Sequence, residues 1–158
     1  MSKNRFDNQV IIAVEDFEIP LSSLNLPDII SVEKELCFDE ATKLMLKHRL
    51  GSLVICEGDQ LLGIFTERDC ITKLELILEN AKIPLCELMT TKMLTLSLND
   101  SLIDALALMS TKGIRHVPIV NSCGVAVKML SAKDILHHVA NLFSAYLADF
   151  EAISNWSK

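Results

Sequence analysis

Apolar residues recur three and four positions apart in two parts of the chain, which is the spacing of one face of an α-helix. The positions are Phe38, Ala41, Leu44 and Met45, and then Leu102, Ala105, Leu108 and Met109. A short β-prone stretch precedes each of these predicted helices, at 29–32 and 93–96. Two apolar runs around a polar, glycine-containing turn follow each helix and predict a β-hairpin. A second helix is expected after each hairpin, over 67–79 and from 132 to about 150.

This pattern is an internal repeat. A shift of 64 residues aligns the first predicted helices, and a shift of 65 aligns the hairpins and the motifs that follow them, "GIFTERD" and "KMLSAKD". The repeated β-α-β-β-α unit predicts an α/β fold of the α+β type. A unit of about 60 residues buries little apolar surface alone, so the two copies are expected to pack face to face with pseudo-twofold symmetry. Equivalent clefts between the copies are the expected ligand sites.

The repeat divides the chain into four predicted parts. They are an N-terminal extension (1–18), a first repeat (19–80), a second repeat (81–140) and a C-terminal helical tail (141–158). The apolar run Val10–Val14 in the extension is predicted to be an added strand. The tail continues an approximately helical apolar stripe, which would either extend an interface between subunits or pack back on its own chain.

Composition narrows the class of protein. The chain has 158 residues, of which 50% are hydrophobic, enough for a sizeable core. Its net charge of -6 argues against a surface for nucleic acid or anionic membrane, and no segment approaches the ~18 consecutive apolar residues of a spanning helix. Five cysteines lack the spacing of a zinc or redox motif. The expectation is therefore a cytoplasmic protein without a metal site.

The repeated motif contains chemistry as well as structure. Thr66 and Asp69, like Ser131 and Asp134, have the spacing of a helix-capping box. A carboxylate in this position also suits the two hydroxyls of a ribose, and a helix N-terminus offers free N–H groups to a phosphate. Arg115-His116 would supply donors beside the cleft, although a solvated charge and a hydrogen-bonded strand-edge residue remain alternatives for the pair.

The chain resembles a tandem pair of CBS domains, the Bateman module. The resemblance covers 19–136 and rests on the order of elements and on four segments. They are "GSLVICEGDQLLGIFTERD" (51–69), "CELMTTKMLTLSLNDSLIDALALM" (86–109), "GIRHVPIV" (113–120) and "MLSAKDIL" (129–136). It implies a stand-alone regulatory pair, usually a homodimer. It also implies an adenosine-containing ligand in the clefts: AMP, ADP, ATP or S-adenosylmethionine.

The resemblance also implies the binding residues. Asp69 and Asp134 would accept from the ribose, while Thr66 and Ser131 would contact ribose or phosphate. The stretches before the first helix of each repeat would line the base. Their residues are Ile29, Ile30 and Ser31, with Met93, Leu94 and Thr95.

The second motif departs from the family pattern. Lys128 stands where the first copy has Gly63, and a glycine lets the backbone approach a ligand closely. Lys128 would therefore either block that approach or offer its ammonium group to a phosphate. The two clefts are expected to differ.

Two other classes of function are open to the sequence. A ligand-free structural dimerisation module would use the same fold with empty clefts. An enzyme is disfavoured, because the chain has no G-x-S-x-G, P-loop, G-x-G-x-x-G or H-E-x-x-H motif. No catalytic residue and no required cofactor is therefore predicted. The protein that reads the ligand state is not identified by the sequence.

Overall fold

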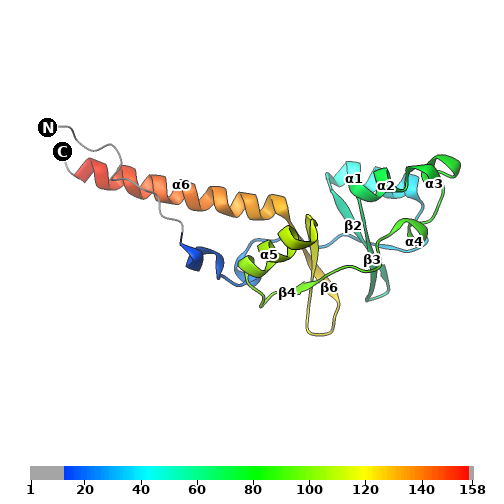
Figure 1. Cartoon of the computed structure of the whole chain (residues 1–158), viewed down its shortest axis with the longest axis horizontal. Helices are drawn as coiled ribbons and strands as arrows, with labels where there is room; N and C mark the ends of the chain where they lie inside the picture. Colours follow the sequence, from blue (N-terminus) through cyan, green and yellow to red (C-terminus); the bar gives the residue numbers. More distant parts are fainter. Residues whose placement is uncertain (1–12, 157–158) are drawn as a thin grey trace.

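Two small sheets, each covered by helices, form the two halves of the protein, and one long helix projects from the second half (Figure 1). The computed structural model describes residues 13–156, with the side chains of 13–144. The first half contains β1 (Ser31–Glu33), α1 (Phe38–His48), β2 (Ser52–Glu57), β3 (Gln60–Thr66), α2 (Glu67–Thr72) and α3 (Leu74–Glu79). Helix α4 (Leu85–Leu88) also packs in this first half. The second half contains β4 (Leu96–Ser97), α5 (Leu102–Lys112), β5 (His116–Val120), β6 (Ala126–Ser131) and α6 (Ala132–Trp156).

Both sheets have the same topology. The first pair of strands is parallel and the second is antiparallel, in the orders β1-β2-β3 and β4-β5-β6. The hairpins have the registers Val54↔Ile64 and Ile119↔Lys128. Buried Val54, Cys56 and Ala126 form an apolar contact between the two sheets. The prediction of two β-α-β-β-α repeats packed with pseudo-twofold symmetry is confirmed.

Helices α1 and α5, which correspond in the two repeats, end in the same way. Each last turn passes into a left-handed residue, which is Gly113 with φ 61° after α5 and Arg49 with φ 54° after α1. Glycine adopts this conformation freely, whereas a side chain makes it costly. The backbone at Arg49 is therefore held there by its surroundings.

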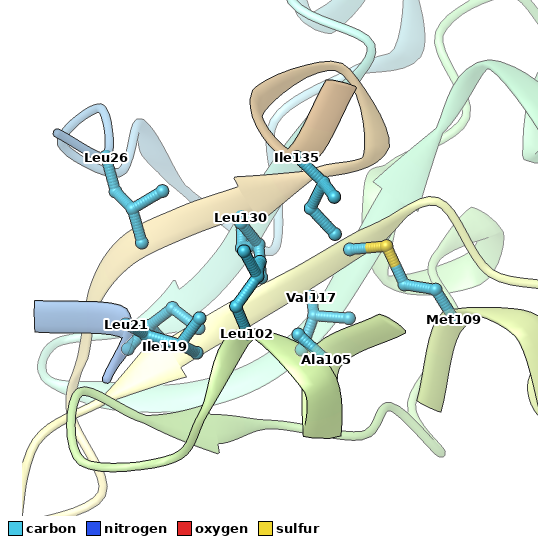
Figure 2. Close-up of a cluster of buried hydrophobic side chains, with 9 residues drawn as sticks. All are labelled: Leu21, Leu26, Leu102, Ala105, Met109, Val117, Ile119, Leu130 and Ile135. Atoms are coloured by element: carbon cyan, nitrogen blue, oxygen red, sulfur yellow. The ribbon is translucent and has the colours of Figure 1, made fainter. Parts of the chain in front are cut away.

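The two halves exchange their N-terminal segments. Leu21 and Leu26 are buried in the core of the second half, among residues of α5, β5, β6 and α6 (Figure 2). Conversely, Ile83, Leu85 and Leu88 are buried in the core of the first half. We call residues 19–28 the first arm and residues 83–90 the second arm. Each arm lies at the start of one sequence repeat and completes the core of the half formed by the other.

Backbone hydrogen bonds hold both arms in equivalent places. Leu102 N–H donates to Ile19 O at 2.9 Å, and Phe38 N–H donates to Ile83 O at 2.9 Å. The isolated bridges Pro20↔Ser101 and Cys37↔Pro84 also correspond under the 64-residue shift. The pseudo-symmetry therefore includes the arms, and sequence repeats and folded halves do not coincide.

Several predicted boundaries are wrong. The strands at 29–32 and 93–96 are shorter and later, because the chain before each strand crosses to the other half as an arm. The helix expected over 67–79 is split at Lys73, and α6 continues to Trp156. In the strand predicted at Val10–Val14, residues 10–12 lie outside the described residues, and Val14 begins a 3-10 turn, Val14–Phe17. A second 3-10 turn, Leu21–Ser23, lies in the first arm.

Candidate functional site

Two clefts lie between the halves, one beside each repeated motif. The first cleft, beside Asp69, has a volume of about 180 Å³. Its lining residues are Gly51, Ile64, Thr66, Glu67, Arg68, Asp69, Thr90, Ile114, Arg115 and His116. The second cleft, beside Asp134, has a volume of about 540 Å³. Its lining residues are Pro27, Asp28, Ile30, Arg49, Leu50, Gly51, Ser52, Glu67, Arg115, His116, Met129, Ser131, Ala132, Lys133, Asp134 and Leu136.

The second cleft has a carboxylate oxygen available for a ligand. Ser131 donates to Asp134 Oδ2 from its backbone N–H at 2.8 Å and from its hydroxyl at 2.5 Å. Asp134 N–H donates back to Ser131 Oγ at 3.3 Å, which completes the predicted capping box of α6. Within the part of the chain whose side chains are described, no group donates a hydrogen bond to Asp134 Oδ1. The half-buried Asp134 can therefore cap its helix and still accept from a ligand.

Cationic side chains surround this carboxylate. Arg49, Arg115 and Lys133 line the second cleft together with the acidic residues Asp28 and Glu67. Arg49 holds its left-handed backbone conformation here, and such strain is commonest at functional sites. The charge of Asp28 is compensated, because Lys128 Nζ lies 2.7 Å from its Oδ1. With Asp28 paired, the three cations outnumber the two remaining carboxylates, Glu67 and Asp134, and the second cleft can accept an anion.

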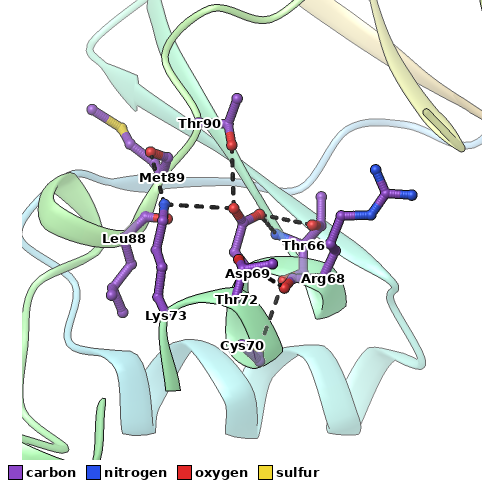
Figure 3. Close-up of polar contacts among 9 residues, drawn as sticks. All are labelled: Thr66, Arg68, Asp69, Cys70, Thr72, Lys73, Leu88, Met89 and Thr90. Carbon is purple, nitrogen blue, oxygen red and sulfur yellow. Dashed lines mark hydrogen bonds and ion pairs between the residues drawn. The ribbon is translucent and has the colours of Figure 1, made fainter. Parts of the chain in front are cut away.

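The first cleft contains the corresponding motif, but its aspartate has more partners within the protein. Asp69 is only 6% exposed, and its Oδ2 accepts from Thr66 N–H at 2.8 Å and from Thr66 Oγ1 at 2.7 Å (Figure 3). Its Oδ1 accepts from the Thr90 hydroxyl at 3.2 Å and lies 3.5 Å from Lys73 Nζ. Both carboxylate oxygens are therefore engaged by the protein.

Gly63 allows the second arm to pack closely against β3. A Cβ at Gly63 would lie 2.6 Å from Met89 Sδ and 3.1 Å from Thr90 O. In the same region Ile64 and Thr90 exchange two backbone hydrogen bonds, of 3.0 and 2.8 Å. The glycine thus permits close approach of an arm, where the sequence suggested close approach of a ligand.

Lys128 occupies the equivalent position in β6. Its ammonium group lies on Asp28 of the first arm, and Lys128 is not among the residues that line either cleft. The first arm is held to β6 by the isolated bridge Asp28↔Lys128 and by a hydrogen bond from Met129 N–H to Pro27 O at 3.3 Å. The Lys128 side chain therefore pairs with the first arm.

Four residues form a wall shared by both clefts: Gly51, Glu67, Arg115 and His116. The His116 ring packs against Gly51, where a Cβ would lie 2.9 Å from Nε2. Burial lowers the pKa of His116, and the charge of Arg115 lowers it further, against the opposing effects of Glu67 and Asp134. The imidazole is therefore neutral near pH 7 and can both donate and accept one hydrogen bond.

The structure brings together part of the predicted site. Thr66, Asp69, Ser131, Asp134, Ile30, Arg115 and His116 line the clefts. Ile29, by contrast, packs against the apolar contact between the sheets, and Ser31 pairs with Val54 in the first sheet. Met93, Leu94 and Thr95 line neither cleft, because the second arm meets β3 at Thr90 before the chain reaches them.

Sequence reasoning missed Arg49 and Gly51. They follow α1 where "GIRH" follows α5. Under the 64-residue shift Arg115 corresponds to Gly51 and Gly113 to Arg49, so applying the shift to this segment would have pointed to both. It also missed Thr90, for which the repeat offers no signal. Among the residues that the structure describes, no cluster of three or more metal-ligating side chains occurs. In the same part of the chain, no helix combines the length and the apolar character needed to span a bilayer.

Comparison with known proteins decides the family. The CBS domain model matches residues 21–76 and 85–141, one match in each repeat. The chain belongs to the CBS domain family. This confirms the resemblance and assigns both motifs to CBS domains.

Relatives of this CBS domain protein include proteins of very different length. An inosine-5'-monophosphate dehydrogenase of Korarchaeum cryptofilum is 27% identical over 122 residues, 77% of this chain but 25% of the enzyme. An uncharacterized 17.7 kDa protein of Acidianus ambivalens is 30% identical over 118 residues, 73% of this chain and 70% of that protein. The match to the dehydrogenase therefore concerns a quarter of that enzyme.

Two similar solved structures contain adenosine compounds. The CBS domain pair of protein MJ0100 was solved with 5'-methylthioadenosine and S-adenosyl-L-methionine. It has a TM-score of 0.69 and 22% identity, and the match covers 78% of this chain and 97% of that one. The structure of CBSX2 with AMP has a TM-score of 0.66 and 18% identity, with coverages of 77% and 97%. At these identities the likeness establishes the fold.

Proposed function

We propose that this CBS domain pair is a regulatory module that binds an adenine nucleotide in the second cleft and passes the ligand state to a protein partner. The proposal depends on one observation, the combination of an available Asp134 oxygen with Arg49, Arg115 and Lys133 in one cleft. The neighbouring CBS structures with AMP or S-adenosylmethionine support the ligand class.

Each part of a nucleotide has a counterpart in the second cleft. Asp134 Oδ1 suits a ribose hydroxyl, because an ionised carboxylate only accepts hydrogen bonds. Arg49, Arg115 and Lys133 suit a phosphate, which Arg can bind through two parallel hydrogen bonds. The N-terminus of the 25-residue helix α6 adds the positive end of a helix dipole.

The base has an apolar surface to pack on. Pro27, Ile30, Leu50, Met129 and Leu136 line the same cleft. Ligand pockets in general are lined mostly by apolar groups, with a few polar groups that fix the orientation. We infer that adenine lies among these five side chains.

The charges favour a nucleotide over S-adenosylmethionine. A sulfonium cation would add positive charge beside Arg49, Arg115 and Lys133, whereas a phosphate would neutralise it. Among the ligands that the family resemblance implies, AMP, ADP and ATP are therefore preferred. Chemical turnover of the nucleotide is not part of the proposal.

Exposed apolar residues on the helices suit a homodimer. They occur at positions that correspond under the repeat: Ile71 and Leu136 are 77% and 68% exposed, and Leu78 and Phe143 are 76% and 43% exposed. Leu136 also lines the second cleft, so a ligand there would touch a residue of the proposed interface. A ligand shifts an assembly only through different affinities for two arrangements, and Leu136 is where we expect that difference to arise.

Calorimetric titration of the full chain with AMP, ADP, ATP and S-adenosylmethionine tests this function. Binding of a nucleotide that is at least about tenfold tighter than binding of S-adenosylmethionine is expected from the charges. The variant Lys133→Met should weaken AMP binding more than it weakens adenosine binding, because it removes a partner of the phosphate. Flat titrations and unchanged Tm with every compound would favour a ligand-free dimerisation module.

A further inference from the structure

Both repeated motifs have a hydroxyl residue three positions before an aspartate, but the two aspartates have different hydrogen-bond partners. In the second motif, only Oδ2 of Asp134 has donors within the described side chains, and both come from Ser131. In the first motif, Asp69 Oδ1 also accepts a hydrogen bond from the Thr90 hydroxyl and forms an ion pair with the Lys73 ammonium group. These two groups occupy the part of the carboxylate that is open in the second motif.

Lys73 connects this carboxylate to the second arm. Its ammonium group donates to Leu88 O and, at 3.3 Å, to Met89 O, besides lying 3.5 Å from Asp69 Oδ1 (Figure 3). The same lysine stands where α2 ends and α3 begins. Asp69, Lys73 and Thr90 therefore join the helices after β3 to the arm that comes from the other repeat.

A ligand would have to break this network to reach Asp69. Binding there would take the buried Asp69 carboxylate from the Thr90 hydroxyl and from the half-buried Lys73 ammonium group, which would keep only its carbonyl partners. Loss of the partners of a buried charge is costly. The space is also small, since the first cleft of about 180 Å³ lies below the roughly 300 Å³ of typical ligand pockets. The second cleft, at about 540 Å³, lies within the usual range.

The first cleft is also poorer in available cations. Arg68 donates from its guanidinium group to Gly113 O at 2.9 Å and so closes the end of α5. Arg115 is shared with the second cleft. A phosphate in the first cleft would therefore compete with the hydrogen bond of Arg68.

We propose that Asp69, Lys73 and Thr90 form a structural latch that closes the first cleft, so that the chain binds one nucleotide, in the second cleft. The site assignment rests on the proposed function. The existence of the latch does not rest on the proposed function, because it concerns only whether the contacts of Asp69 stabilise the fold.

The two motifs provide a matched pair of variants, Asp69→Asn and Asp134→Asn, in the full chain. The wild type titrated with AMP should bind one equivalent per chain. Asp134→Asn should weaken binding by about tenfold or more, the loss expected for a charge-assisted hydrogen bond. Asp69→Asn should leave the Kd within about twofold while lowering the Tm more than Asp134→Asn does. Two equivalents per chain, or a tenfold weaker Kd with Asp69→Asn alone, would overturn the proposal.

A milder pair of variants covers the case in which Asp69→Asn does not fold. Lys73→Met and Thr90→Val each remove one member of the latch, and both should bind AMP with the wild-type Kd and stoichiometry at a lower Tm. In amide NMR spectra, AMP should shift the signals of 131–134 and leave those of 66 and 69 in place. Shifts confined to 66 and 69 would contradict the proposal.

The outcomes separate the latch from the proposed function. If the wild type binds no adenosine compound, the proposed function and the site assignment both fail. The latch is then judged by stability alone: a lower Tm for Asp69→Asn than for Asp134→Asn supports it, and equal Tm values refute it.

Discussion

Replacement of Gly63 by alanine tests whether this glycine makes room for the second arm. The added Cβ would lie 2.6 Å from Met89 Sδ, 2.9 Å from Met89 Cγ and 3.1 Å from Thr90 O. Met89 is a flexible side chain that can move, but the Thr90 carbonyl accepts one of the two backbone hydrogen bonds that hold the arm to Ile64. The Met89 side chain must therefore move, and the backbone of the arm must shift by a few tenths of an ångström.

The magnitude follows from two opposing effects. Overpacking of this kind costs about 1–3 kcal/mol, and the reduced freedom of the unfolded chain returns about 0.4–1 kcal/mol. The net loss lies between about 0 and 2.6 kcal/mol and centres near 1.3 kcal/mol. The central value corresponds to a fall in Tm of roughly 3–5 °C for a chain of this size.

Thermal unfolding followed by circular dichroism measures this change, and Lys128→Ala is the matched control at the equivalent position of β6. That control loses only an ion pair with an exposed partner, which is worth about 0–1 kcal/mol. The reasoning would be refuted if Gly63→Ala unfolded at the wild-type temperature, or if the control fell further than Gly63→Ala.

Two further predictions concern the core and the shared wall. Leu85→Ala, which truncates a fully buried side chain of the second arm, should destabilise the protein by about 2–5 kcal/mol in chemical denaturation, whereas Leu46→Ala, 79% exposed, should stay within about 0.5 kcal/mol. Equal losses of stability in the two variants would show that Leu85 is not part of the core. The lowered pKa of His116 means that the unfolded chain takes up a proton near pH 6.5 before the folded chain does, so stability should fall as the pH drops below about 6.5. His116→Gln should flatten that dependence in unfolding curves measured across the range, and an unchanged slope would show that His116 does not cause it.

Much of the fold was predictable because it depends on local patterns. Apolar spacing located α1 and α5, glycine-containing turns located both hairpins, and the 65-residue recurrence of the motif identified the repeat. The exchanged arms were not predictable in this way. The sequence shows that Leu21 and Leu85 are apolar, but burial in one core or the other depends on contacts far away in the chain.

In the candidate site, too, the features set by local sequence were predictable and those set by distant contacts were not. Asp134 and Ser131 lie where the motif suggested, because a capping box is formed within four consecutive residues. The state of Asp69 depends instead on Thr90, which is 21 positions away and has no counterpart in the second motif. Short strands β1 and β4 were misplaced for a related reason, since strand pairing is decided by a partner and not by local propensity.

The most direct test of the account is a calorimetric titration of AMP into the full chain and into Asp134→Asn, with Asp69→Asn as the paired control. The account predicts one binding equivalent in the wild type, a Kd weaker by about tenfold or more in Asp134→Asn, and a Kd within about twofold of wild type in Asp69→Asn. Wild-type affinity in Asp134→Asn would contradict the claim that the second cleft is the nucleotide site.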